Sequence, residues 1–193
     1  SSGFGEWGVD ECLDSLGRQG TEKCIVIGID SGPGRMSEYN PYDYKATKGN
    51  ANAYIDFIVN SLKPYVDKNL RTMVHKKHTF IAGSSMGGLV SFYAVMKYPD
   101  VFGGAGIFSP SFWIAPAIIN DLDKAGKKMH SKLFFYAGAT ESTTMLSDMQ
   151  NVESKLKSLS HSSLLEQVDA NAKHNEAAWR KYFPVFYKWI MRK

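Results

Sequence analysis

Short apolar runs alternate along this chain with longer stretches in which apolar residues recur every three or four positions. The short runs have the length and the content of β-branched and aromatic residues that strands favour. Because they are apolar throughout, they indicate strands buried on both faces, as in a parallel sheet covered by helices. The expected strands are 24–30, 79–82, 104–109, 132–138 and 164–168.

The longer stretches predict helices that place one apolar face against such a sheet. Two of them contain proline, and we expect Pro64 to kink or restart one helix and Pro184 to bend or split the last. Strands that alternate with helices predict an α/β fold, with a mostly parallel sheet and helices on both faces. The expected helices are 7–16, 51–70, 89–98, 142–159 and 176–191.

The length of 193 residues suits one domain with a sizeable core, and we assign residues 1–193 to a single domain. The net charge of +4 is spread over short basic clusters, which predicts no nucleic-acid partner. No apolar run reaches 18 residues, so the sequence predicts no membrane span. Cys12 and Cys24 allow at most one disulfide, which leaves the redox compartment and the cellular location open.

Residues 83–87 read Gly-Ser-Ser-Met-Gly and match the G-x-S-x-G pattern of a nucleophile elbow, between an expected strand and an expected helix. The pattern places Ser85 at a strained turn, and we expect a Cβ at either glycine to collide with the neighbouring strand or helix. Ser84 is in the wrong register, because Ala82 and Met86 flank it. The alternative is a turn of small residues that only packs a helix on a strand. We favour Ser85 as a nucleophile.

A serine nucleophile needs a base, normally a histidine oriented by a carboxylate, and with this elbow the chain order is serine, acid, histidine. His174 follows the last expected strand and precedes the last helix, so we expect its ring at the carboxyl edge of the sheet. A solvated surface histidine is the alternative. The remaining histidines precede Ser85 or lack a strand directly before them: His75, His78, His130 and His161.

Glu141 is the preferred acid, because it lies in the loop that leaves the carboxyl end of the expected strand 132–138. Sheets of this kind collect their functional groups at that edge. Asp148, one to two helical turns later, is the second candidate, with a solvated helix position as its alternative reading.

Five segments together carry a resemblance to a known family: 81–88, 98–102, 108–113, 136–141 and 174–179. They resemble the putative-esterase family of α/β hydrolases, which includes enterochelin-type siderophore esterases and feruloyl esterases. The resemblance covers nearly the whole chain and implies an α/β-hydrolase fold. It implies a triad of Ser85, Glu141 and His174 for ester hydrolysis through an acyl-enzyme. It also implies the Met86 N–H as one oxyanion donor, and neither a cofactor nor a metal ion is expected.

Residues 35–39, Arg-Met-Ser-Glu-Tyr, are similar to an Arg-x-x-Glu-Tyr segment that lies beside the pocket in this family. Arg35 is therefore a candidate for binding an anionic or phenolic group of the substrate, and a loop brace with Glu38 is the alternative. Trp113 leaves an expected strand at the pocket edge and is a candidate substrate contact, with core packing as the alternative. We expect a small-molecule or carbohydrate-linked ester with a bulky or aromatic part.

In this family, strands precede the helix that corresponds to 7–16, and the loop entering that helix supplies the second oxyanion N–H. One of those strands lies between the strands expected here at 24–30 and 79–82. An open gap there would leave backbone groups unpaired. We therefore expect these residues to be the C-terminal part of a longer domain, or the chain to close the gap by pairing with a second copy as a homo-oligomer.

The leading functional hypothesis is a serine carboxylic-ester hydrolase. An acyltransferase of the same fold, in which a sugar or lipid hydroxyl replaces water, fits the sequence equally well. A catalytically weak hydrolase-fold module that binds carbohydrate is the third hypothesis, because loss of one oxyanion donor costs about 10²–10³ in rate.

Overall fold

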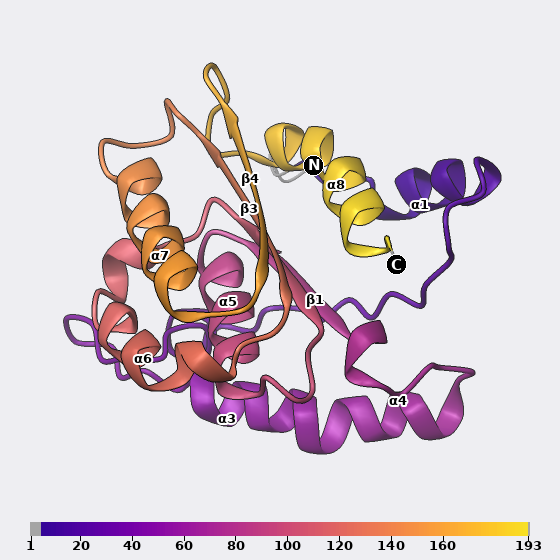
Figure 1. Cartoon of the computed structure of the whole chain (residues 1–193), viewed down its shortest axis with the longest axis horizontal. Coiled ribbons are helices and arrows are strands. Elements are labelled where there is room, and N and C mark those ends of the chain that lie inside the picture. The colour runs from indigo at the N-terminus through magenta and orange to yellow at the C-terminus, as the bar shows by residue number, and fades with distance from the viewer. Residues whose placement is uncertain (1–4, 193) are drawn as a thin grey trace.

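The computed structural model describes residues 5–192. At its centre is a parallel sheet of four strands in the order β1-β2-β3-β4, so that each strand lies beside the next one in the sequence (Figure 1). The strands are β1 (Phe80–Ser84), β2 (Gly104–Phe108), β3 (Lys132–Gly138) and β4 (Ser163–Asp169). Because all four run in one direction, the loops that leave their carboxyl ends meet at one edge of the sheet.

Eight α-helices surround this sheet within the described residues. They are α1 (Val9–Arg18), α2 (Arg35–Glu38), α3 (Ala51–Phe57), α4 (Lys63–Asn69), α5 (Met86–Lys97), α6 (Ile118–Ala125), α7 (Met145–Leu159) and α8 (Glu176–Ile190). One core holds the buried residues of α3, α5, α6 and α7, and a second holds those of α8 and the end of α1. Figure 1 shows α8 and α1 on the opposite side of the sheet from α5 and α7. The predicted α/β fold with helices on both faces is confirmed.

β3 shows why the expected strands are apolar at successive positions. Leu133 and Phe135 belong to the core under α5 and α7, whereas Phe134 and Tyr136 belong to the core under α8. None of these four side chains has exposed surface. Alternate residues of one strand therefore fill two separate cores, as a sheet covered on both faces requires.

The strand expected at 24–30 is not formed, so the prediction of five strands was wrong. The segment is extended and exposed, and the side chains of Ile25, Val26 and Ile27 are 47%, 54% and 42% exposed. A strand requires hydrogen bonds to a neighbour, and β1, at the edge of the described sheet, pairs only with β2. The residues with strand propensity are present, but they have no strand beside them.

The two prolines have different effects. The helix expected at 51–70 passes through a π-helical turn at Ile58–Leu62 and restarts as α4 with Pro64 in its first turn, as predicted. Pro184 lies inside α8, which continues to Ile190, so the predicted split was wrong. The buried side chains of Phe183 and Phe186 hold this helix on the sheet despite the missing N–H at Pro184.

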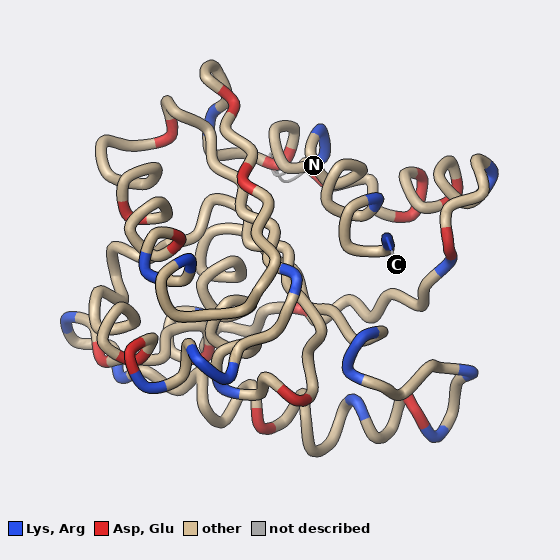
Figure 2. The backbone as a smooth tube through the Cα atoms, viewed as in Figure 1, with Lys and Arg blue, Asp and Glu red and all other residues tan. Residues whose placement is uncertain are grey.

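Charged residues of both signs are interspersed along the backbone (Figure 2). Within residues 5–192, no stripe of basic residues follows one element, in agreement with the pattern of short clusters in the sequence. In residues 5–192, no helix combines the length and the apolar character needed to cross a membrane.

Candidate active site

Ser85 occupies a strained turn between β1 and α5. Its backbone has φ 58° and ψ −120°, a conformation that residues other than glycine rarely adopt. Its amide donates a hydrogen bond of 2.9 Å to the carbonyl of Phe108, which ties the turn to the end of β2. The strand, turn and helix of a nucleophile elbow are therefore present at Ser85.

The glycines of this turn differ in how close a Cβ atom at each would come to neighbouring atoms. A Cβ at Gly83 would lie 2.7 Å from the carbonyl carbon of Gly87, so no side chain fits there. A Cβ at Gly87 would meet no atom within 4 Å, and the expected collision at that glycine was wrong. The second close approach is one residue later, where a Cβ at Gly88 would lie 2.9 Å from the carbonyl oxygen of Phe108. Helix α5 meets β2 at that position.

Glu141, in the loop after β3, has a fully buried side chain whose two oxygens both have partners. Its Oε1 accepts hydrogen bonds from the Gly138 amide at 2.6 Å and from the Ser109 hydroxyl at 2.7 Å. Its Oε2 lies 2.8 Å from Nδ1 of His174. Three contacts to one buried carboxyl group fix its orientation.

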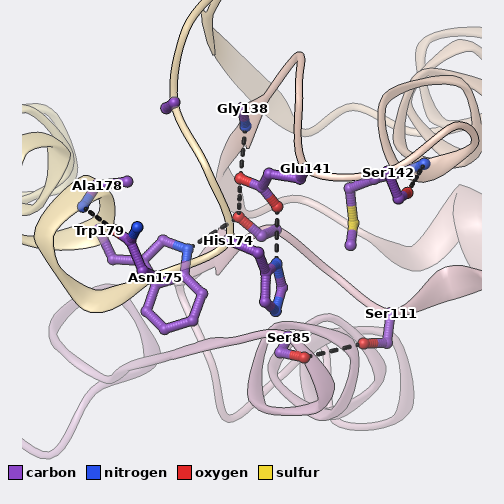
Figure 3. Close-up of polar contacts among 12 residues, drawn as sticks. Ser85, Ser111, Gly138, Glu141, Ser142, His174, Asn175, Ala178 and Trp179 are labelled. Atoms are coloured by element: carbon purple, nitrogen blue, oxygen red, sulfur yellow. Dashed lines mark hydrogen bonds and ion pairs between the residues drawn. The ribbon is translucent and has the colours of Figure 1, made fainter. Parts of the chain in front are cut away.

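His174 comes from the loop between β4 and α8, where the sequence places it. Its Nδ1 faces Glu141, and the opposite edge of the ring faces Ser85 (Figure 3). A carboxylate only accepts hydrogen bonds, so Nδ1 donates to Glu141, and in the neutral imidazole this arrangement leaves the lone pair on Nε2. Asn175 then caps α8 through a 3.0 Å bond from the Ala178 amide, which fixes the chain direction directly after His174. The His174 side chain is 34% exposed and open to solvent.

The loops that carry Glu141 and His174 are bound to each other. The Thr140 hydroxyl donates to the carbonyl of Ala172 at 2.7 Å. A Cβ at Gly138 would lie 2.4 Å from the same carbonyl oxygen, so only glycine permits this approach. The contact holds the loop after β3 against the loop after β4.

The Ser85 hydroxyl pairs with the Ser111 hydroxyl at 3.2 Å. Among the hydrogen bonds of residues 5–192 it makes none to His174, although the sequence analysis implies a bond between nucleophile and base. The Ser85 Oγ is instead turned toward Ser111 (Figure 3). Catalytic hydrogen bonds are often long or misaligned without substrate, so this geometry is compatible with His174 as the base for Ser85 after rotation of the serine side chain.

Asp148, the second candidate for the acid, lies in the first turn of α7. Its Oδ2 is buried and has no hydrogen-bond partner in the described structure. The His174 ring pairs with Glu141 instead.

Met86 is the first residue of α5 and is buried. The first amides of a helix have no carbonyl one turn earlier to bond, so the Met86 N–H lies at the free, positive end of the helix dipole. It directly follows Ser85, which is where an oxyanion donor has to be in this kind of elbow.

Arg35 begins α2, and its guanidinium lies 5.3 Å from the ring centroid of Tyr39. The expected alternative, a brace between Arg35 and Glu38, is not among the ion pairs of the described residues. The side chain is therefore placed by an aromatic ring.

Trp113 lies in a short 3₁₀ turn, Phe112–Ile114, and is 51% exposed. This exposure excludes the alternative of core packing. Its ring meets Tyr44 edge to face, with centroids 5.7 Å apart. The exposed Trp113 ring and the half-buried Tyr44 ring form an aromatic pair two residues beyond Ser111.

Sequence reasoning assigned no role to Ser109, Ser111 or Trp179, which all contact the residues above. The Trp179 indole donates to the Ser109 hydroxyl at 2.9 Å, and that hydroxyl donates to Glu141. The available signal is that all three lie inside the segments 108–113 and 174–179 that carry the family resemblance.

In residues 5–192, no three side chains of His, Cys, Asp or Glu gather closely enough to hold a metal ion. The polar chemistry at this edge of the sheet is that of a carboxyl group, an imidazole and several hydroxyls.

Solved structures with the same fold include the BES protein from Bacillus cereus, which has a TM-score of 0.78 and 17% identity, with 96% of this chain and 77% of that one covered. The enterobactin esterase FES from Shigella flexneri has a TM-score of 0.74 and 18% identity, and the match covers 92% of this chain but 46% of the Shigella chain. This chain therefore spans about half of that enzyme. The likeness establishes an α/β-hydrolase-like fold.

In sequence, the chain is 25% identical over 201 residues to the protein YbbA of Bacillus subtilis, covering 95% of this chain and 80% of YbbA. The model of a protein family described as Putative esterase matches residues 1–190. That match extends over the elbow, both loops at the sheet edge and the helices that support them. The chain thus belongs to the Putative esterase family.

Proposed function

We propose that this chain is a serine carboxylic-ester hydrolase that works through an acyl-enzyme on Ser85. The observation that carries the proposal is the buried Glu141, which holds the His174 ring so that its free edge faces the strained Ser85 (Figure 3). Membership in an esterase family supports the same reaction class.

In the first half-reaction, Ser85 Oγ rotates from Ser111 toward His174 and attacks the ester carbonyl carbon while Nε2 takes its proton. The carbonyl oxygen gains negative charge, and the Met86 N–H donates a hydrogen bond to it. The bond between the carbonyl carbon and the alcohol oxygen then breaks. The alcohol leaves with the proton that His174 held, and the acyl group remains on Ser85.

In the second half-reaction, His174 takes a proton from water, and the hydroxyl attacks the acyl carbon. Collapse of this intermediate breaks the bond to Ser85 Oγ, which recovers its proton from His174, and the carboxylic acid is released. Glu141 accepts the Nδ1 hydrogen bond throughout and stabilises the imidazolium. It transfers no proton itself.

For the substrate, we propose an ester with an aromatic or bulky part that packs on Trp113 and Tyr44. The exposed Trp113 ring, in edge-to-face contact with the half-buried Tyr44, supports this choice. Arg35 is the proposed contact for an anionic or phenolic group. The Shigella relative in fold is an enterobactin esterase whose structure was solved in the presence of 2,3-di-hydroxy-N-benzoyl-glycine, an aromatic compound.

The test is turnover of p-nitrophenyl acetate, combined with labelling by a serine-directed phosphonate. We expect release of p-nitrophenol, one covalent adduct by intact mass, and loss of both in Ser85→Ala but not in the neighbouring Ser84→Ala. Faster release of p-nitrophenol together with ester formation on an added sugar or lipid alcohol would identify an acyltransferase. Absence of turnover and of adduct, with binding of an oligosaccharide in a titration, would identify a binding module.

A further inference from the structure

Trp179 is linked to both the acid, Glu141, and the base, His174. It lies in the first turn of α8 and is 6% exposed. Its Nε1–H donates to the Ser109 hydroxyl, which in turn bonds Glu141. Its ring also stands at 90° to the His174 ring, with centroids 5.0 Å apart (Figure 3). One buried side chain thus reaches the acid through Ser109 and the base through direct ring contact.

The direction of this hydrogen-bond chain is fixed by chemistry. An indole nitrogen only donates, so the Ser109 oxygen accepts from Trp179. The single proton of that hydroxyl is then directed at Oε1 of Glu141, 2.7 Å away. Bonds in such a chain polarise and strengthen one another in a buried site. The indole therefore determines where the Ser109 proton points.

The backbone of Ser109 gives an independent reason to assign its hydroxyl a role. Ser109 has φ 45°, in the left-handed region that favours glycine, and it is fully buried. Glycine would adopt this conformation with less strain. Strained positions persist where the surroundings fix them, and here the surroundings are Trp179, Glu141 and the carbonyl of Tyr136, which accepts from the Ser109 amide at 2.6 Å.

We infer that Ser109 and Trp179 are positioning residues for the proposed esterase reaction, on which this inference rests. They hold the Glu141 carboxylate with Oε2 toward His174, and the perpendicular contact with the indole keeps the imidazole ring in the plane that directs Nε2 at Ser85. Neither residue touches the reacting atoms. Both act through Glu141 and His174.

The first test compares Ser109→Ala, Trp179→Phe and the double variant. We expect each single variant to lower kcat about 10- to 100-fold, as loss of an orienting hydrogen bond does elsewhere, with KM nearly unchanged. The double variant should be no slower than Ser109→Ala, because both changes interrupt the same hydrogen-bond chain and phenylalanine keeps an aromatic ring beside His174. Additive losses, or kcat values within twofold of the unmodified chain, would overturn the inference.

Two control variants make the same substitutions at positions that do not contact Glu141 or His174. Trp189→Phe makes the same change in a partly buried indole further along α8. Ser131→Ala removes a buried hydroxyl that donates to the Phe102 carbonyl, next to the opposite end of β3. Both controls should keep kcat within twofold. An equal loss of kcat in the controls would mean that the effects on activity come from stability alone.

Ser109→Gly distinguishes the hydroxyl from the backbone. If Ser109 served only to make the turn, glycine would preserve activity, because it relieves the strain at φ 45°. We expect instead the same loss of kcat as in Ser109→Ala. The thermal stability of Ser109→Gly should be equal to or higher than that of Ser109→Ala, because glycine relieves the strain at φ 45°. Full activity of Ser109→Gly would overturn the inference.

A signature that does not depend on turnover completes the test. The Nδ1 proton between His174 and Glu141 should give a downfield proton NMR signal that shifts or broadens in Ser109→Ala and Trp179→Phe and stays unchanged in Ser131→Ala. An unchanged signal in the two positioning variants would overturn the inference. Unreduced ester turnover in Ser85→Ala would instead overturn the proposed function, whatever the NMR signal shows.

Discussion

The hydroxyls of Ser85 and Ser111 lie 3.2 Å apart, and the Ser111 amide donates to the Ser85 carbonyl at 3.1 Å. Two contacts between the same two residues thus hold the elbow after β1 against the loop after β2. The amide contact fixes the backbone of the elbow. The hydroxyl contact keeps Oγ turned away from His174, and an attack by Ser85 on a substrate would first have to break it.

This relationship predicts that Ser111→Ala makes Ser85 more reactive. Without the hydroxyl of Ser111, Oγ is free to bond His174, and the rate of labelling by a phosphonate should rise about two- to tenfold, the equivalent of one neutral hydrogen bond. Stopped-flow labelling kinetics would measure it. Ser142→Ala, which changes a serine three residues before the first residue of α7, serves as the control. Slower labelling of Ser111→Ala would show that its hydroxyl assists the attack.

Ser85→Ala should lower kcat for p-nitrophenyl acetate by about 10⁴- to 10⁶-fold, because the acyl-enzyme cannot form. Thermal unfolding should change little, since the side chain makes one hydrogen bond and alanine leaves the backbone contacts to Phe108 and Ser111 in place. Activity in Ser85→Ala combined with an inactive Ser84→Ala would assign the nucleophile to the other serine.

Glu153, far from the proposed chemistry, should make stability depend on pH. It is 1% exposed in α7, and neither carboxyl oxygen has a hydrogen-bond partner in the described structure. Burial, and then the charge of Glu166 on β4, raise the pKa of Glu153 from 4.5 to about 7, while Lys157, 3.6 Å away, opposes the shift. The folded chain therefore binds this proton more tightly than the unfolded chain does.

Protonated Glu153 therefore contributes to the free energy of unfolding. This contribution is complete below pH 4.5 and is lost as pH rises through about 7, and the total is on the order of 3 kcal/mol. Urea unfolding at pH 5 and pH 8 would measure the loss, and Glu153→Gln should remove most of the difference. Glu166→Gln should remove a smaller part. A Glu153→Gln chain that keeps the full pH dependence would assign it to other groups.

Trp113→Ala should lower kcat/KM for aromatic esters more than for acetate esters. The indole provides an exposed ring surface against Tyr44, and its loss removes stacking worth about 0.5–1.5 kcal/mol, or two- to tenfold. Steady-state kinetics with p-nitrophenyl acetate and an aromatic acyl ester would separate the two effects. Equal values of kcat/KM before and after the change, for every ester, would remove Trp113 from the proposed substrate site.

The free edge of β1 and the exposed residues Ile25 and Ile27 predict self-association of the 193-residue chain. Light scattering after size exclusion should show a mass that increases with concentration. The double variant Ile25→Lys and Ile27→Lys should shift the chain toward the monomer, because lysine on an extended edge opposes strand pairing. A monomer at every concentration would contradict this prediction.

The sequence predicted the parts of the fold that depend on local periodicity. β3 was predicted with its observed bounds, because one apolar run at 132–138 is buried on both faces. The prediction of a strand at 24–30 was wrong, because a strand also needs a neighbouring strand, and a local sequence pattern does not show whether one is present. The predicted split at Pro184 was wrong for a related reason, since packing under α8 outweighs one missing hydrogen bond.

The pairing of Glu141 with His174 was predicted from chain order and from the positions of two strand ends. The contact between Ser109 and Trp179 was not, since 70 residues separate them and neither belongs to a motif with an assigned role. The Ser111 contact depends on a side-chain rotamer, which a sequence pattern does not specify. Sequence thus located the ends of the strands, whereas the supporting contacts required the packed structure.

The hydrogen bond between Thr140 and Ala172, and the close approach that Gly138 permits, join the loop after β3 to the loop after β4 at this edge of the sheet. The loops bearing Glu141 and His174 are joined directly by these contacts, whereas Ser85 comes from the turn between β1 and α5. A small shift of one part against the other would therefore change the spacing between the His174 ring and Ser85 more than the spacing between Glu141 and His174. A substrate bound at Ser85 would lie across the spacing that changes.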